Sequence, residues 1–132
     1  MPLPYGKIWV LIVDDNEEHV QLCVESLPAE EFQADAAGTG AEAMRMLERN
    51  DYDIIVLDYT LPDTSGFELL KKIKGRGYQV PTVFVTATDD PDLSMKVLRA
   101  GACDYIVKTF RYYSNLRGRL LENLEACSVP KR

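Results

Sequence analysis

Residues 10–15 read Val-Leu-Ile-Val-Asp-Asp, a short apolar run that ends abruptly in two acids. The same arrangement recurs along the chain: residues 54–57 precede Asp58, residues 83–85 precede Thr86, and residues 106–107 precede Lys108. Short apolar runs bounded by polar residues, with helical patterns between them, are typical of buried strands in a parallel sheet. The carboxyl ends of parallel strands share one edge, where open α/β sheets bind ligands. We therefore expect Asp14, Asp15, Asp58, Thr86 and Lys108 to meet at that edge.

The order of the elements predicts the fold class. Strands are expected at residues 8–13, 32–37, 53–57, 82–86 and 103–107. Helical spacing and capping residues place helices at about residues 17–27, 40–49, 66–74, 91–100 and 112–126. Because crossovers between parallel strands are right-handed, this alternation predicts an α/β, doubly wound, flavodoxin-like (βα)5 domain with strand order 2-1-3-4-5. We expect one domain over residues 1–132, with its core at about residues 7–126 and terminal extensions at 1–6 and 127–132.

The bulk composition excludes several classes of function. The chain has 132 residues, 46% of them hydrophobic, and a net charge of −6. An acidic balance argues against a direct nucleic-acid surface. No apolar run is long enough to cross a membrane, and the N-terminus lacks a signal-peptide pattern, so we expect a cytoplasmic location. Three widely spaced cysteines form neither a disulfide framework nor a zinc pattern, and we expect Cys23 and Cys103 to be small buried hydrophobes. His19, the single histidine, is expected on the surface.

The chemistry of the shared edge follows from its charges. Two unit charges about 4 Å apart repel by about 4 kcal/mol at an effective dielectric constant of roughly 20, so three carboxylates need a compensating cation. Lys108 supplies one charge, and Mg²⁺ suits an incomplete cage of hard oxygen ligands. Such an ion with a nearby lysine and threonine is typical of phosphoryl transfer. No Gly-rich phosphate loop is present, which leaves a carboxylate of the protein as the simplest phosphoryl acceptor.

These residues resemble the receiver domain of two-component response regulators over roughly residues 7–124. The matching stretches are residues 10–15, 58–66 (Asp-Tyr-Thr-Leu-Pro-Asp-Thr-Ser-Gly), 85–87 and 101–108. The resemblance implies that a sensor histidine kinase or a histidine phosphotransfer protein phosphorylates Asp58. It also implies that Asp15, Asp58 and the backbone carbonyl of Thr60 bind Mg²⁺, with Asp14 acting through a bound water.

The resemblance further implies a switch. Lys108 would pair with the phosphoryl group, Thr86 would move to hydrogen-bond it, and Tyr105 would turn inward when Thr86 moves. The chain would then be no conventional enzyme, since its only chemistry would be self-catalysed phosphoryl transfer to Asp58 and autodephosphorylation. Aromatic and arginine residues near the last strand and helix favour a downstream partner, or self-association, at the helix 4–strand 5–helix 5 face. Partly buried aromatics with solvated charges are the alternative for those residues: Tyr105, Arg111, Tyr112, Tyr113, Arg117 and Arg119.

One residue departs from the family pattern. Proline usually follows the lysine in receiver domains, with a cis peptide bond, and here Thr109 stands in its place. A cis bond before a non-proline residue costs about 2.5–4 kcal/mol, so we expect either a trans bond with an altered loop or a strained cis bond. The departure leaves room for a phosphorylation-independent interaction module, and a small Mg²⁺-dependent phosphohydrolase is a third reading. The sequence leaves open whether the chain is a stand-alone regulator or one domain of a longer protein.

Overall fold

A computed structural model describes residues 6–109 and 111–127 of the chain. The strands form one parallel sheet in the order β2-β1-β3-β4-β5, which confirms the predicted fold class. The bounds of the strands are β1 Ile8–Val13, β2 Phe32–Ala37, β3 Ile54–Asp58, β4 Thr82–Thr86 and β5 Asp104–Val107.

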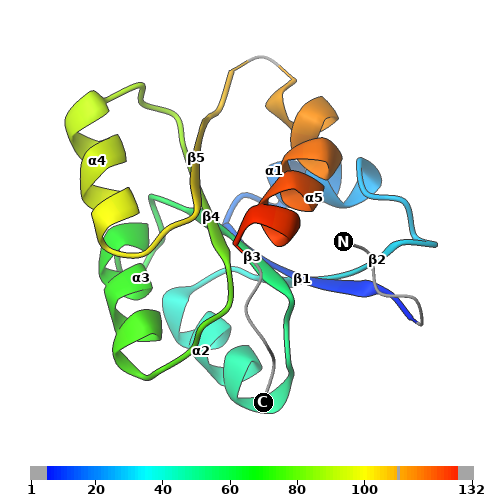
Figure 1. Ribbon diagram of the computed structural model, residues 1–132, viewed down its shortest axis with the longest axis horizontal. Coiled ribbons are helices and arrows are strands. Elements are labelled where there is room, and N and C mark those ends of the chain that lie inside the picture. Colours follow the sequence, from blue (N-terminus) through cyan, green and yellow to red (C-terminus); the bar gives the residue numbers. More distant parts are fainter. Residues whose placement is uncertain (1–5, 110, 128–132) are drawn as a thin grey trace.

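The helices lie in two layers around the sheet. In Figure 1, α1 and α5 cover one face, and α2, α3 and α4 lie on the other. The bounds are α1 Glu17–Glu25, α2 Gly40–Arg49, α3 Gly66–Gly75, α4 Pro91–Arg99 and α5 Leu116–Ala126. Within the described ranges, no helix has the length and apolar character that a bilayer crossing requires.

The expected and observed element bounds differ mainly at the last helix. The other elements begin and end within two residues of their predicted positions. The last helix opens instead with a 3-10 turn, η1 (Tyr112–Asn115), before α5 begins. The residue before η1, Arg111, has a left-handed backbone with φ of 59°, which a sequence pattern of apolar spacing does not reveal. The proposed terminal extensions fall largely outside the described residues, so the domain limits stay a prediction.

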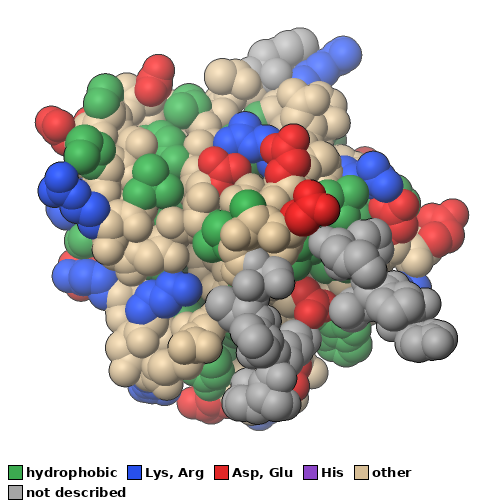
Figure 2. Space-filling model, viewed as in Figure 1, with side chains coloured by type: hydrophobic (Ala, Val, Ile, Leu, Met, Phe, Trp, Pro, Cys, Tyr) green, Lys and Arg blue, Asp and Glu red, His purple; other side chains and the backbone are tan. Residues whose placement is uncertain are grey.

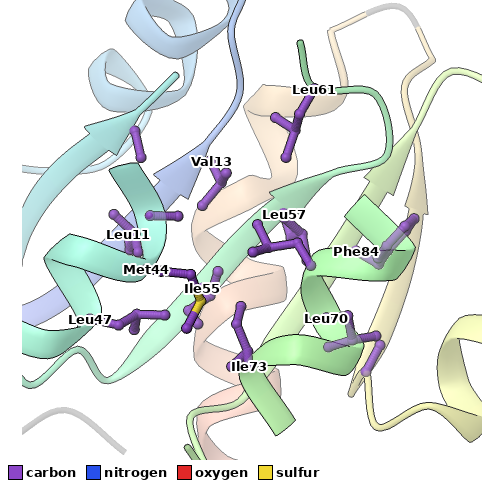
Figure 3. Close-up of a cluster of buried hydrophobic side chains, with 14 of the residues drawn as sticks. Leu11, Val13, Met44, Leu47, Ile55, Leu57, Leu61, Leu70, Ile73 and Phe84 are labelled. Carbon is purple, nitrogen blue, oxygen red and sulfur yellow. The ribbon is translucent and has the colours of Figure 1, made fainter. Parts of the chain in front are cut away.

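Alternation along the central strands divides the core between the two faces. On β1, the side chains of Leu11 and Val13 join one cluster of buried residues, whereas Val10 and Ile12 join the other. Figure 3 shows the first cluster, where Leu57 and Phe84 from the sheet face Leu70 of α3. Each large apolar side chain buried in this way contributes about 1.5–3 kcal/mol. The strands are apolar on both faces because both faces are covered, and this burial fixes where their polar ends emerge.

A glycine holds the loop after β3 against the sheet. A Cβ atom at Gly66, the first residue of α3, would overlap the backbone carbonyl of Asp58. The same loop is closed by a bridge between Thr60 and Ser65, and the Ser65 hydroxyl accepts the Glu68 N–H to cap α3. Only a residue without a side chain permits this close approach. The geometry of the chain just after Asp58 is thereby fixed.

Candidate functional site

Three acids meet where β1 and β3 end. β1 and β3 are paired neighbours, with Val13 opposite Leu57, so the residues that follow them lie side by side. One ligand oxygen from each of Asp14, Asp15 and Asp58 lies within 4.8 Å of the others. Asp14 and Asp58 are buried, and Asp15 is exposed. The structure therefore brings together the three carboxylates that the sequence places at separate strand ends.

Lys108 lies between two of these acids. Its Nζ is 2.9 Å from Oδ1 of Asp58 and 3.4 Å from Oδ2 of Asp14, and its side chain is only 12% exposed. Burial opposes the charge of Lys108, but the ion pairs with Asp58 and Asp14 outweigh it and raise the pKa of the ammonium. Burial also raises the pKa of Asp58, and the hydrogen bond from Lys108 offsets only part of that rise. One ammonium thus serves two buried carboxylates, which leaves the cluster short of positive charge.

The peptide bond between Lys108 and Thr109 is trans, since no cis bond occurs among the described residues. Next to it, the Thr109 N–H donates to the Val107 carbonyl at 2.8 Å, which makes a tight turn around Lys108. The Lys108 N–H meanwhile donates to the Thr86 carbonyl at 2.7 Å. Of the two peptide-bond states expected, the structure has the trans one. With threonine at position 109, the Lys108 ammonium lies 2.9 Å from Oδ1 of Asp58.

Thr86 and Tyr105 are linked through the backbone of Thr88. The buried Thr86 hydroxyl accepts the Thr88 N–H at 3.2 Å, and the Tyr105 hydroxyl donates to the Thr88 carbonyl at 2.8 Å. The Tyr105 ring is half-buried and stacks on Phe84, with 6.3 Å between ring centroids and 3° between planes. A change in the partner of the Thr86 hydroxyl would therefore alter the backbone segment that holds the Tyr105 hydroxyl.

His19 is a neighbour of the site that sequence reasoning missed. Its Nδ1 lies 3.4 Å from Nζ of Lys108 and 3.9 Å from Oδ2 of Asp14, although the side chain is 38% exposed. An ammonium can only donate, so the ring nitrogen accepts in this contact. The placement follows from Asn16, whose side chain accepts the His19 N–H and begins α1. The start of α1 turns His19 toward the residue that follows β5, and no sequence pattern predicts this long-range contact between His19 and Lys108.

Comparison with known proteins decides the family. The family model of the response regulator receiver domain matches residues 10–120, most of the chain. The chain belongs to this family. The chain is 35% identical to the response regulator SaeR of Staphylococcus epidermidis, in an alignment that covers 76% of this chain and 44% of SaeR. They are 31% identical to the transcriptional regulatory protein PcoR of Escherichia coli over 78% of the chain and 46% of PcoR.

A solved structure supports the same assignment. The receiver shares 27% identity and a TM-score of 0.83 with a CheY-like response regulator receiver domain protein from Methanospirillum hungatei, covering 92% of this chain and 96% of that one. The chain spans less than half the length of SaeR and PcoR. The similarity therefore concerns the receiver domain and not the activities of the two whole proteins.

The donor set of the receiver fits a hard divalent cation. Asp14, Asp15 and Asp58 offer only carboxylate oxygens, which suit Mg²⁺, and Asp15 is open to solvent while the other two are not. Lys108 alone does not neutralise three carboxylates. These residues could hold Mg²⁺ with room for water ligands, and the part assigned to the Thr60 carbonyl stays a prediction.

Several residues expected on a partner-binding face are occupied within the receiver itself. The Tyr112 hydroxyl contacts the Cys23 thiol at 3.4 Å beneath α1, and Arg117 makes two bonds of 2.6 and 2.8 Å to Glu31. Tyr113 packs against the core cluster beside α1 and α5, and Arg119 bonds to Asp104. Tyr112 and Tyr113 are therefore partly buried aromatics, as the alternative interpretation of this face expected, but Arg117 and Arg119 are ion-paired and not simply solvated.

The expectation that both Cys23 and Cys103 are buried holds for one of them. Cys23 is buried as expected, whereas Cys103, next to the start of β5, is only half-buried, so the expectation for Cys103 was wrong.

Proposed function

We propose that this receiver is a phospho-acceptor switch in which Asp58 takes a phosphoryl group from a histidine kinase or a histidine phosphotransfer protein. The observation that supports this most directly is the ion pair between Asp58 and Lys108, 2.9 Å long and set within the acidic cluster. In the transfer, a bond forms between phosphorus and a carboxylate oxygen of Asp58 as the donor's P–N bond breaks. Mg²⁺ held by Asp14, Asp15 and Asp58 would neutralise phosphoryl charge when bound.

Each neighbouring residue has a defined part in this proposal. The Lys108 ammonium, already beside Asp58, pairs with a phosphoryl oxygen once the carboxylate is esterified. The Thr86 hydroxyl exchanges its bond with the Thr88 N–H for one to the phosphoryl group. Because Thr88 also holds the Tyr105 hydroxyl, that exchange shifts the balance between two positions of Tyr105. A phosphoryl group adds about −1.5 to −2 charge at pH 7, enough to bias such a two-state element.

The same proposal places the output at the face formed by α4, β5 and α5. Met95 and Leu98 on α4 are 52% and 43% exposed, unusually high for large apolar side chains. Figure 2 shows hydrophobic side chains gathered over the region of α4, with lysine or arginine side chains beside them. Tyr105 lies on β5, next to this helix in the fold. A downstream protein, or a second receiver, would bind here, with Met95 and Leu98 in place of Tyr112 and Arg117 as contacts.

Intact mass spectrometry tests the proposal. The chain is incubated with acetyl phosphate and Mg²⁺, and the expected result is one added phosphoryl group that is lost on later incubation. An Asp58→Asn variant should gain none, and peptide mapping should place the group at Asp58. Glu68→Gln, a surface substitution away from the cluster, is the matched control and should be phosphorylated normally.

Two other outcomes would replace this proposal. No mass gain, with the fold intact and Mg²⁺ bound, would indicate an interaction module that works without phosphorylation. Repeated turnover of varied phosphate esters without a lasting adduct would indicate a phosphohydrolase. Neither alternative draws support from the position of Lys108, which stays on Asp58 despite Thr109.

A further inference from the structure

An exposed carboxylate of the loop between β3 and α3 completes the start of α2. The local capping residue, Thr39, accepts the Glu42 N–H through its hydroxyl at 3.0 Å. Two further N–H groups of the first turn, those of Gly40 and Ala41, donate to the carboxylate of Asp63 at 2.8 and 3.0 Å. The start of α2 therefore takes part of its cap from a residue 22 and 23 positions further along the chain.

Charge and shape both suit this contact. The N-terminus of a helix carries partial positive charge, and hydrogen bonds from its N–H groups to a carboxylate are charge-assisted. The bonds from Gly40 and Ala41 accordingly lower the pKa of the Asp63 carboxyl. Gly40 is buried, and a Cβ atom there would lie only 2.7 Å from Cγ2 of Thr64. The loop therefore lies directly against α2, with no room for a side chain between them.

The segment that enters α2 is bonded on both sides of the acidic cluster. At the end of β2, the Ala37 carbonyl accepts the Asp14 N–H at 3.0 Å. A few residues later, the start of α2 binds Asp63, whose loop begins directly after Asp58. Residues 37–41 thus connect the backbone of one acid with the loop that follows another.

The loop after β3 is folded back on itself between its two ends. Gly66 lies against the Asp58 carbonyl at its base, and Thr60 pairs with Ser65. Asp63 lies between the paired residues and links this part of the loop to α2. Because segments with fewer long-range bonds open more readily, loss of the Asp63 carboxylate should let the loop move relative to the acidic cluster.

We propose that Asp63 is a positioning residue for the metal site: by anchoring the β3–α3 loop to α2, it holds the backbone after Asp58 in the geometry that binds Mg²⁺. The inference rests on the proposed function, in which Mg²⁺ is bound by the acidic cluster and the Thr60 carbonyl. Asp63 acts through the loop and is not itself a ligand. Loss of groups that orient metal ligands without binding the metal costs roughly 10–100-fold in affinity. We expect about tenfold here, because the loop supplies one ligand among several.

Calorimetric titration of the full chain with Mg²⁺ tests the inference. Asp63→Ala should raise the dissociation constant for Mg²⁺ about tenfold. Asp63→Asn, which keeps one acceptor oxygen, should fall between Asp63→Ala and the parent. In phosphorylation by acetyl phosphate, the Mg²⁺ concentration that gives the half-maximal rate should rise by the same factor in Asp63→Ala. The rate at saturating Mg²⁺ should stay at the parental value, because the loop is held in place once the ion is bound.

Asp53→Ala is the matched control. Asp53 directly precedes β3, and its carboxylate accepts the Trp9 N–H at 2.8 Å, a long-range bond of the same kind at the opposite end of the strand. Both alanine variants should be less stable in urea, but only Asp63→Ala should bind Mg²⁺ more weakly. Faster hydrogen exchange at Gly40 and Ala41, with later amides of α2 still protected, will show that Asp63→Ala has lost the anchor and kept the fold.

A second variant reaches the same contact from α2. Gly40→Ala adds the Cβ atom that would meet Thr64, so it should also weaken Mg²⁺ binding. Gly38→Ala is its control, because a Cβ atom at Gly38 has no neighbour within 4 Å. The double variant Asp63→Ala/Gly40→Ala should bind Mg²⁺ no more weakly than the weaker single variant, since both changes break one contact. Additive losses would contradict a single anchoring contact.

The outcomes separate this inference from the proposed function. Equal Mg²⁺ dissociation constants for Asp63→Ala, Asp53→Ala and the parent would overturn the anchoring role while phosphorylation of the parent at Asp58 still stands. A parent that binds Mg²⁺ but gains no phosphoryl group would overturn the proposed function, and weaker Mg²⁺ binding by Asp63→Ala would then still support the anchor. A parent that binds no Mg²⁺ would overturn the anchoring role.

Discussion

The two ends of β5 carry charged clusters of opposite character. At its start, Asp104 accepts bonds from Arg119 at 2.8 and 3.0 Å, from Asn123 at 2.8 Å and from the Tyr105 N–H at 2.8 Å. Just beyond its end, the single ammonium of Lys108 is shared between Asp14 and Asp58 of the acidic cluster. Burial would raise the pKa of Asp104, but its donors prevail and lower it, whereas the pKa of Asp58 is raised.

This difference separates a structural ion pair from a chemical site. A carboxylate with a full set of donors contributes to stability and has no capacity left for a ligand. A group of carboxylates with too few donors costs stability and attracts a cation. At the start of β5 the carboxylate of Asp104 therefore has a full set of hydrogen-bond donors, whereas the carboxylates beyond its end have too few. The following experiments test that contrast.

The largest effect is expected for Lys108→Ala. Removing the ammonium beside Asp58 should slow the phosphorylation of Asp58 by acetyl phosphate on the order of 100-fold, as loss of one well-placed charge-stabilising donor does elsewhere. Arg119→Gln removes one positive charge from the satisfied cluster and should leave the rate unchanged. The phosphorylation rates are measured by intact mass. Equal rates for the two variants would contradict the proposed difference between the clusters at the two ends of β5.

Addition of Mg²⁺ should stabilise the receiver through the unsatisfied cluster. At about 100 times its dissociation constant, a ligand that binds only the folded state adds about 2.7 kcal/mol to the free energy of unfolding, and EDTA should reverse the gain. Urea unfolding with and without Mg²⁺ measures it. Asp15→Asn should lose most of this gain, since Asp15 is the exposed member of the acidic cluster. Asp104→Asn should retain the gain in full.

Asp104→Asn should destabilise the protein by about 1–2 kcal/mol at pH 7, because charge-assisted bonds from Arg119 and Asn123 are weakened. The partial exposure of the Arg119 pair keeps the effect at this modest level. The sign of the pH dependence follows from the lowered pKa of Asp104. Its contribution is complete above the ordinary pKa of 3.8 and is lost as the pH falls through the lower native value. The variant should therefore lose less stability than the parent during acid unfolding.

Asp58→Asn should change the free energy of unfolding in the opposite direction to Asp104→Asn. The raised pKa of Asp58 means that folding disfavours its ionised form, so the amide should stabilise the metal-free protein by about 1 kcal/mol at pH 7. The gain should shrink as the pH falls toward 3.8, the ordinary pKa, where the parent carboxyl becomes protonated. Urea unfolding at several pH values, with EDTA present, provides the measurement. A destabilised variant would show that the ion pair with Lys108 outweighs burial.

The smallest effect is expected at His19. His19→Ala removes the acceptor that contacts Lys108, but the exposed ring makes this bond weak, and the phosphorylation rate should change by no more than about threefold. His19→Gln, which keeps an acceptor, should recover the parental rate. A change as large as that of Lys108→Ala would place His19 within the reacting group instead of at its border.

Local sequence was sufficient for most of the elements. The runs of Val, Ile and Leu are apolar throughout because both faces of the sheet are covered, and capping residues such as Ser65 mark helix starts. Strand order then follows from alternation and handedness, which is why Asp14, Asp15 and Asp58 could be expected at one edge. The start of α5 was missed because the left-handed backbone of Arg111 and the short 3-10 turn leave no periodic signal.

The long-range contacts required the folded chain. The contacts of His19 with Lys108 and of Arg117 with Glu31 both join residues that lie far apart in sequence. The sequence by itself determined the fold, the residue types at the sheet edge and their excess negative charge, because these depend on local patterns and connection rules. Only the tertiary structure decided which donor serves which carboxylate, because that depends on distances of a few ångströms between elements packed by their apolar faces.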